Sequence, residues 1–315
     1  MGDQDYLTCR ALGVALAELI QNPKTVIVAS SDLSHFHPYS EAIKLDEKVL
    51  NAIEEWDYFN MSRNLQSRIW EACGGGPIVA TMIAAERLGT NEAKVIKYAN
   101  SGDVAKGDKS RVVGYASAIF YKSENTNDAH SADFQLNKAE QERLLKIAKE
   151  SVESIVRRGE LSECNSGGFN TLNLDRGAFV TLNKAGQLRG CIGYTAPMQP
   201  LYLTIRSAAA SAAVKDHRFM PVSENELDEI TYDISVLSPF RLVKNTDQIE
   251  IGKHGLFIKK GESEGLLLPQ VATDYNWDRI TFLEQTCRKA GLPINAWKDK
   301  ETDIFMFSAF VFEEK

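Results

Sequence analysis

The sequence predicts two domains, an α/β domain followed by an α+β domain with a mainly antiparallel sheet. The 315 residues exceed what one ordinary core holds. Helical and strand patterns mix before residue 122, whereas predicted hairpins outnumber crossovers after residue 136. Between them, residues 123–136 are hydrophilic and rich in turn formers, which indicates a linker. We therefore expect the domains to cover 1–122 and 137–315.

The first domain opens with a predicted helix over residues 3–20, whose apolar side chains recur at helical spacing. Next, the β-branched run Thr25–Ser30 predicts a strand that is buried on both faces. Polar residues come directly after this run, and strand ends are where α/β proteins place their chemistry. The remaining expected elements are helices over 41–56 and 78–88, the latter opened by Pro77, and strands over 95–100 and 112–121.

The second domain begins with a long amphipathic helix predicted over residues 138–158. An Asn-Lys-Ala-Gly turn then separates two strand-like runs and predicts a hairpin. The expected elements after the first helix are strands over 178–183 and 187–194, a helix over 201–214, a strand over 230–238, a hairpin of 255–260 and 265–269, a helix over 277–290 and a strand over 304–312.

Composition restricts the partners and the compartment. The formal net charge of −7 provides no basic field for a phosphate backbone, so we expect no nucleic-acid partner. The longest apolar runs fall far short of the roughly 20 residues that span a bilayer, so we expect no membrane partner. The first residues form neither a basic nor an apolar leader, which predicts a cytoplasmic protein. The five scattered cysteines are expected to be reduced thiols.

One cluster of candidate metal ligands lies in the first domain. Asp32 and His35 follow the predicted strand, and Cys73 precedes three glycines at the start of a helix. Carboxylate, imidazole and thiolate groups bind divalent metals or transfer protons. The alternative is structural: Asp32 caps a turn, His35 bonds to a carbonyl and Cys73 packs in a glycine-rich turn. Spacing alone does not decide between these readings.

The second domain offers a candidate thiol site at the end of a predicted strand. Arg189 lies two residues before Cys191, where a guanidinium would stabilise a thiolate. We expect His217 to serve as the base of this nucleophilic pair. In the alternative reading Cys191 packs under a tight turn while Arg189 pairs with a structural carboxylate.

Ordered motifs in each domain resemble two known families. The first set resembles the carboxyl-terminal part of the Memo family, which implies a truncated Memo domain. The second set resembles the AMMECR domain. The motifs of the first set are ASSDLSHFHPY (29–39), ACGGGPI (72–78), YANSGD (98–103) and VVGYAS (112–117), and those of the second are GAFVTLN (177–183), LRGCIGY (188–194), DHRFMPV (216–222), GLLLPQVA (265–272) and FLEQTCRKAGLP (282–293).

The resemblance implies a cofactor and a partner. Fusion of these domains resembles proteins B and A of the AmmeMemoRadiSam system, which implies a radical-SAM protein as partner. Memo proteins are similar in fold to class III extradiol dioxygenases, whose pocket binds non-haem iron. His35 and Cys73 match a histidine and a cysteine of that pocket, whereas no histidine precedes His35 to match the others. With Asp32 added the site is still incomplete, so iron or another divalent metal is expected only if the pocket is completed.

Three functions follow as hypotheses. The first is an enzyme, or an accessory to one, that acts with the radical-SAM protein through the cleft of Cys191, Arg189 and His217. The second is a non-catalytic interaction protein, and the third is an iron dioxygenase-like protein acting through His35 and Cys73. An incomplete sheet in the first domain would expose an edge, so self-association is also expected. The sequence leaves substrate and reaction open.

Overall fold

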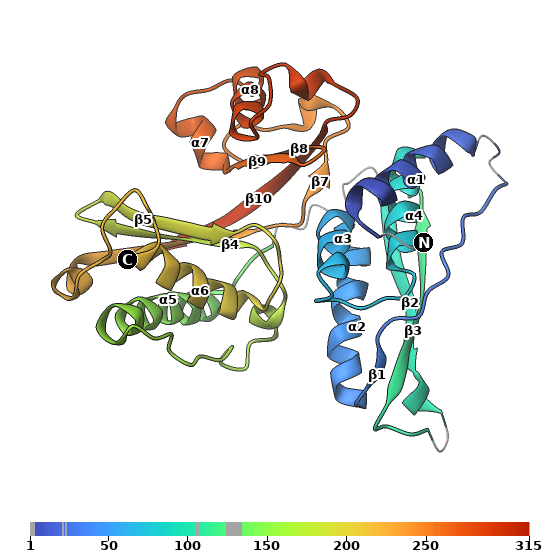
Figure 1. Ribbon diagram of the computed structural model, residues 1–315, viewed down its shortest axis with the longest axis horizontal. Helices are drawn as coiled ribbons and strands as arrows, with labels where there is room; N and C mark the ends of the chain where they lie inside the picture. The colour runs from blue at the N-terminus through green and yellow to red at the C-terminus, as the bar shows by residue number, and fades with distance from the viewer. Residues whose placement is uncertain (1–3, 21, 23, 105–106, 124–133, 315) are drawn as a thin grey trace. The chain divides into compact units, whose positions relative to one another are not determined.

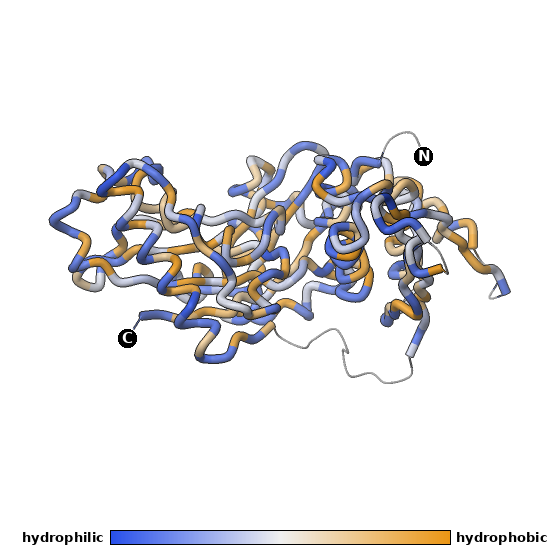
Figure 2. The backbone as a smooth tube through the Cα atoms, turned by 90° about the horizontal axis from the view of Figure 1, so that it is seen from below, coloured by the Kyte–Doolittle hydropathy of each residue, from blue (hydrophilic) through white to orange (hydrophobic). Residues whose placement is uncertain are grey.

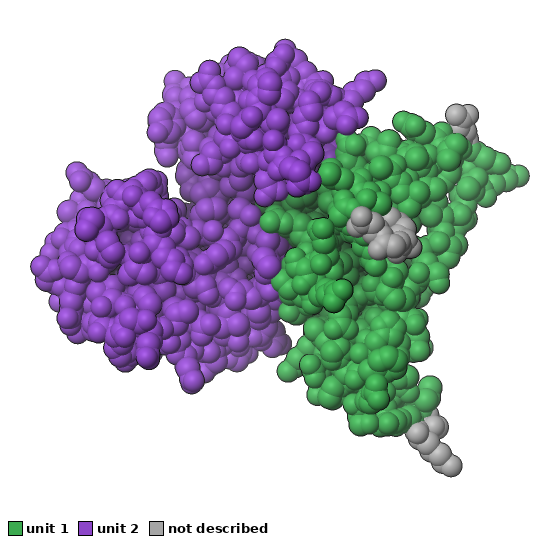
Figure 3. Space-filling model, viewed as in Figure 1, with its two compact units in different colours: residues 1–132, 239–241 green, residues 133–238, 242–315 purple. Residues whose placement is uncertain are grey.

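The chain folds into two compact units in a computed structural model that describes residues 4–20, 22, 24–104, 107–123 and 134–314. Unit 1 comprises residues 1–132 with 239–241, and unit 2 comprises 133–238 with 242–315 (Figures 1 and 3). Most of the predicted linker, residues 124–133, lies outside the described residues. The domain bounds inferred from the sequence therefore stay a prediction.

Within its described residues, unit 1 combines a small antiparallel sheet with four α-helices. The strands follow the order β1-β3-β2, so β3 is central and β2 lies at an edge. A capping residue, Asp5, begins the first helix by accepting a hydrogen bond from the Thr8 N–H. The elements are α1 (Tyr6–Leu19), β1 (His35–His37), α2 (Tyr39–Glu54), α3 (Tyr58–Gln66), α4 (Gly75–Arg87), β2 (Glu92–Asn100) and β3 (Val112–Tyr121).

Helix α4 lies at the centre of the unit 1 core. Its apolar composition suits this position, since Val79, Met82 and Ile83 are almost fully buried. The helix begins at Gly75 after Gly74 as its N-cap, so the prediction that Pro77 opens it is wrong by two residues. Helix α3 was not predicted from the sequence. The start of helix α4 is buried next to Cys73, and the N–H groups of Gly74 and Gly76 donate to the side chains of Ser31 and Gln4.

The segment Thr25–Ser30 contradicts its predicted structure. It is extended but belongs to no strand, and the exposed fractions of Val26 and Val28 are 80% and 81%. A β-branched run becomes a strand only when a neighbouring strand supplies hydrogen bonds and packing. Strand β1 pairs with β3 only at Val112 and Val113, and this earlier segment stays separate from the sheet. Asp32 and His35 therefore follow an unpaired segment and not a buried strand.

Unit 2, as far as the structure describes it, is built on an antiparallel sheet of seven strands. The order is β5-β4-β6-β10-β8-β9, with β7 paired to β10. The long last strand serves two parts of the sheet, because residues 303–308 pair with β8 and 309–313 with β6. The strands are β4 (Ala178–Lys184), β5 (Gln187–Tyr194), β6 (Ile230–Leu237), β7 (Arg241–Leu242), β8 (His254–Lys260), β9 (Ser263–Leu267) and β10 (Asp303–Glu313).

Two apolar clusters fill unit 2. In one, α5 (Lys138–Arg158) and α6 (Leu201–Val214) pack on β4 and β6, with Leu144, Ile205 and Val180 fully buried. In the other, α7 (Pro269–Asp274) and α8 (Arg279–Lys289) accompany β8–β10. Peripheral loops of this unit are mostly hydrophilic (Figure 2). None of the helices in the described residues is long and apolar enough to cross a membrane.

These observations confirm the predicted fold class. Mixed α/β content in the first part and an α+β second part with antiparallel pairing are both present. The predicted helix over residues 138–158 matches α5 at both ends, where Asn137 caps the start and Gly159 adopts the left-handed conformation at the stop.

Candidate functional site

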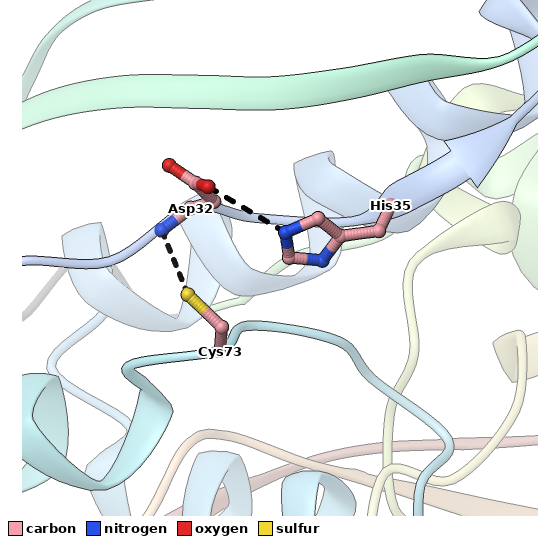
Figure 4. Close-up of side chains that lie close together, drawn as sticks. All are labelled: Asp32, His35 and Cys73. Atoms are coloured by element: carbon pink, nitrogen blue, oxygen red, sulfur yellow. Dashed lines mark hydrogen bonds and ion pairs between the residues drawn. The ribbon is translucent and has the colours of Figure 1, made fainter.

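Three side chains that the sequence singled out lie together in unit 1. One ligand atom from each of Asp32, His35 and Cys73 lies within 4.8 Å of the other two (Figure 4). The imidazole Nε2 of His35 is 3.5 Å from a carboxylate oxygen of Asp32. Cys73 is exposed, and the other two side chains are half-buried, so the group is open to solvent.

Hydrogen bonds of the backbone hold the segment of Asp32 against the segment of Cys73. The N–H of Asp32 donates to the Cys73 Sγ at 3.2 Å, and the N–H of Cys73 donates to the Asp32 carbonyl oxygen. Gly74 then donates its N–H to the Ser31 hydroxyl oxygen at 2.8 Å. A Cβ at Gly74 would lie 2.3 Å from the Ser30 carbonyl oxygen, so only glycine permits this close approach. The glycine run thus brings the thiol to the carboxylate.

The two histidines of this region, His35 and His37, contact different carboxylates. Between them, Phe36 has a φ of 63°, and the register of β1 against β3 shifts at the same place. A left-handed residue in a strand redirects the side chains around it. His35 therefore reaches Asp32, whereas the His37 Nε2 lies 3.0 Å from both carboxylate oxygens of Glu71. Alternation along a regular strand would have placed both imidazoles on one face.

A buried carboxylate on α2 positions the backbone beside the cluster. Asp46 is fully buried and accepts hydrogen bonds from the Ser34 N–H at 2.8 Å and the Tyr98 hydroxyl at 2.7 Å. Burial, together with this bond to Asp46, raises the pKa of Tyr98. Sequence reasoning missed Asp46. The signal was an acidic residue on the apolar face of the predicted helix, between Ala42 and Val49.

The donor set fits a divalent transition metal. Imidazole nitrogen, carboxylate oxygen and thiolate sulfur all ligate zinc and related ions, at bond lengths of about 2.0–2.3 Å. Donors around such an ion lie roughly 3–4 Å apart, which small side-chain rotations reach from the observed spacing. Three protein ligands would leave at least one coordination position for water or another ligand.

In unit 2, Cys191 lies on the edge strand β5 and is half-buried. Its Sγ accepts a hydrogen bond from the Thr181 hydroxyl at 3.2 Å. Its N–H donates to Asp216 at 2.9 Å, and Arg218 donates to its carbonyl oxygen. Burial raises the pKa of the Cys191 thiol, despite opposing effects of Thr181 and Arg218. The direction of this shift runs against the ionised thiolate expected from the sequence, which stays a prediction.

Arg189 takes part in a structural clamp and not in thiol activation. Its guanidinium donates two 3.0 Å hydrogen bonds to the Glu226 carboxylate and others to the carbonyl oxygens of Met220 and Pro221. These bonds hold the pKa of Glu226 well below its usual range. The cation closest to Cys191 in the sequence thus points elsewhere, and Arg218, held by Asp216, is the one that reaches its backbone.

His217 is exposed, and no hydrogen bond joins it to Cys191 within the described chain. The structure therefore brings Cys191 together with Thr181, Asp216 and Arg218, of which only Thr181 was not expected at this cleft. Asp216 and Arg218 belong to the DHRFMPV motif, and the resemblance to the AMMECR domain implies that residues 216–221 line the same cleft as Arg189 and Cys191.

The fold and the two clusters define a two-domain protein with a candidate metal centre in its first unit and a clamped edge strand in its second. Comparison with protein families then identifies both parts. Residues 1–119 match the model of the Memo-like protein family, and residues 145–312 match the AMMECR1 family model. The chain is a fusion of these two domains and belongs to the AMMECR1 family.

Similar proteins occur in archaea and bacteria. A protein of Thermococcus onnurineus is 43% identical over 182 residues, which cover 55% of this chain and 89% of the relative. One from Aquifex aeolicus is 47% identical over 146 residues, covering 44% and 75% of the two chains. The crystal structure of an uncharacterised protein from Pyrococcus horikoshii is 37% identical with a TM-score of 0.55, covering 58% of this chain and 95% of that one.

Proposed function

We propose that this chain is a metal-dependent component of the AmmeMemoRadiSam system, in which unit 1 binds a divalent transition metal and the protein acts with a radical-SAM partner. The convergence of Asp32, His35 and Cys73 carries the proposal, because three different metal-ligating groups lie within 4.8 Å of one another. The pairing of a Memo-like with an AMMECR1 domain supports the assignment to this system.

Each residue has a distinct part in the proposed centre. Cys73 and His35 would bind the metal, with Asp32 as third ligand. The Asp32 N–H donates to the Cys73 Sγ and so fixes the direction of this sulfur. A bound ion with an open position supplies Lewis-acid chemistry or, if it is iron as in extradiol dioxygenases, redox chemistry. Asp46 would hold the Ser34 backbone in place.

Metal titration of the purified full chain tests this function. We expect wild-type protein, dialysed against Zn²⁺ or anaerobic Fe²⁺ and analysed for metal, to retain about one equivalent. His35→Ala and Cys73→Ser each remove a ligand and should weaken binding by about 100-fold or more. His37→Ala is the matched control, since it alters a histidine two residues away that faces Glu71. Equal metal content in wild type and in a double variant of His35 and Cys73 would refute the proposal.

For unit 2 we propose binding and not thiol catalysis. The specific observation is the clamp, in which the polar side chains near Cys191 are committed to structural bonds. Asp216 is tied to Arg218 at 2.7 Å, and Arg189 is tied to Glu226. This arrangement favours the role of an interaction module that presents the radical-SAM partner with a rigid edge. Copurification of that partner by the wild type and equally by Cys191→Ser would support it, and loss in the variant would contradict it.

A further inference from the structure

The segment Thr25–Ser30 runs as an extended stretch of chain that belongs to no strand (Figure 1). Among the described residues, nothing forms a backbone hydrogen bond with the N–H groups of residues 26–31. Its side chains alternate, since Ile27 and Ala29 are half-buried while Val26 and Val28 are about 80% exposed. In the space-filling view an opening separates this segment from the rest of unit 1 (Figure 3).

A cavity of about 460 Å³ lies behind the segment. It is bounded by residues 25–29 on one side and by the inner face of β3 on the other, with α4 side chains such as Ile78 and Ala85 between them. Beyond Gly114, β3 pairs only with β2, so its other edge faces this cavity unpaired within the described structure. An apolar, strand-like segment thus stands beside an incompletely filled layer.

Other strand edges of the chain carry protection that this segment lacks. The edge strand β2 bears the exposed lysines Lys94 and Lys97, and charged side chains on an edge oppose pairing with another chain. At the edge strand β5, Asp216 and Arg218 occupy the backbone N–H and carbonyl of Cys191. Residues 25–31, TVIVASS, contain no charge, proline or glycine. This edge is open to strand addition.

We propose that the occupant is the same segment of a second copy, paired antiparallel about Val28. In this register Val28 faces Val28 and Ile27 faces Ala29, while Val26 faces Ser30. Odd-numbered residues therefore lie opposite odd-numbered residues, and even opposite even. The half-buried side chains of both copies then lie on the same face of the two-stranded pair. A twofold axis through Val28 generates a closed dimer, because in an isologous contact the same edge of each copy pairs with that of the other.

The charges at the ends of the segment favour a second copy as the partner and antiparallel pairing of the two segments. Lys24 and Asp32 bracket the uncharged run at equal distance from Val28, and both side chains are accessible. Antiparallel pairing therefore sets Lys24 of each copy opposite Asp32 of the other at both ends. A parallel, in-register pairing would set like charges opposite and is disfavoured. The segment is thus complementary to itself in charge, in hydrogen bonding and in side-chain pattern.

The oligomeric state of the full chain tests the proposal. In sedimentation or light scattering at micromolar concentration, we expect wild type at twice the 35.0 kDa of one chain. Val28→Lys puts two positive charges face to face at the axis and should shift the midpoint of dissociation by at least tenfold. Ile96→Lys is the matched control: it adds the same charge at a half-exposed apolar residue of unit 1 and should leave the dimer intact.

Cross-linking locates the contact without weakening it. Val28→Cys places two thiols at the axis, and we expect mild oxidation to give a reducible dimer that wild type, with its own five cysteines, does not give. Circular dichroism of each variant checks that it is folded. A monomeric wild type overturns the proposal. A wild-type dimer that Val28→Lys leaves unchanged, with no Val28→Cys cross-link, overturns it as well.

Discussion

At the scale of single residues, the environment of a side chain decides its chemistry, and the sequence shows that environment only in part. Cys73 and Cys191 both looked reactive beside glycines. Cys73 is exposed and accepts a hydrogen bond from a backbone N–H, whereas Cys191 is half-buried and accepts one from a hydroxyl. The guanidinium two residues from Cys191 would have served as an activator if Glu226 did not bind it. Distant carboxylates of this kind are invisible to local spacing.

The raised pKa of Cys191 predicts slow alkylation at neutral pH. A raised pKa means that the thiol stays protonated to higher pH, so the reactive thiolate is scarce at pH 7 and increases only above the ordinary range of about 8.5. We expect the rate of iodoacetamide labelling, followed peptide by peptide, to keep rising beyond pH 9. Thr181→Val removes a hydrogen bond that lowers this pKa and should slow labelling at pH 8 further.

The contrary result would be informative. A labelling rate at Cys191 that is half-maximal below pH 8 would restore the thiolate nucleophile that the sequence suggested. Labelling of Tyr194-containing peptides from Cys191→Ser protein provides the blank, because this peptide then holds no thiol.

At the scale of elements, sequence patterns predicted the helices and hairpins that depend on neighbouring residues. They did not predict structure that depends on pairing with a distant strand. Helix α5 carries its own cap, amphipathic face and glycine stop, and its bounds matched. The hairpin of β4 and β5 also has its turn residues in the sequence. By contrast, Thr25–Ser30 has a strand composition but no strand beside it. For the candidate metal site, the ligands could be named from their chemistry, while Asp46 and the bulge at Phe36 depend on tertiary contacts.

Packing of β3 against α2 provides a test at this scale. A Cβ at Gly114 would lie 2.0 Å from a carboxylate oxygen of Asp46, so Gly114→Ala must displace the group that holds Ser34. We expect the free energy of unfolding in urea to fall by about 1–3 kcal/mol and metal affinity to fall with it. Ser117→Ala, at an exposed position of the same strand, should change neither quantity. If Gly114→Ala has the same free energy of unfolding as the wild type, Asp46 does not fix this backbone.

At the scale of the whole molecule, the chain joins two units that each have their own core. Unit 2 fills its sheet with two apolar clusters, and unit 1 centres on α4. The net charge of −7 gives the chain no general affinity for polyanions. A ligand that binds only the folded form of one unit stabilises that unit by mass action, by about 2.7 kcal/mol at a concentration of 100 times Kd.

Hydrogen exchange measured by mass spectrometry therefore separates the roles of the two units. With saturating Zn²⁺, peptides that contain residues 30–37 and 71–79 should exchange more slowly, because the metal would tie Asp32 and His35 to Cys73. Peptides of β4 and β5 should be unaffected, since their hydrogen bonds belong to a different core. In Cys73→Ser protein the metal effect should vanish from the first set. Protection of β4 and β5 by Zn²⁺ in this variant would instead place the metal in unit 2.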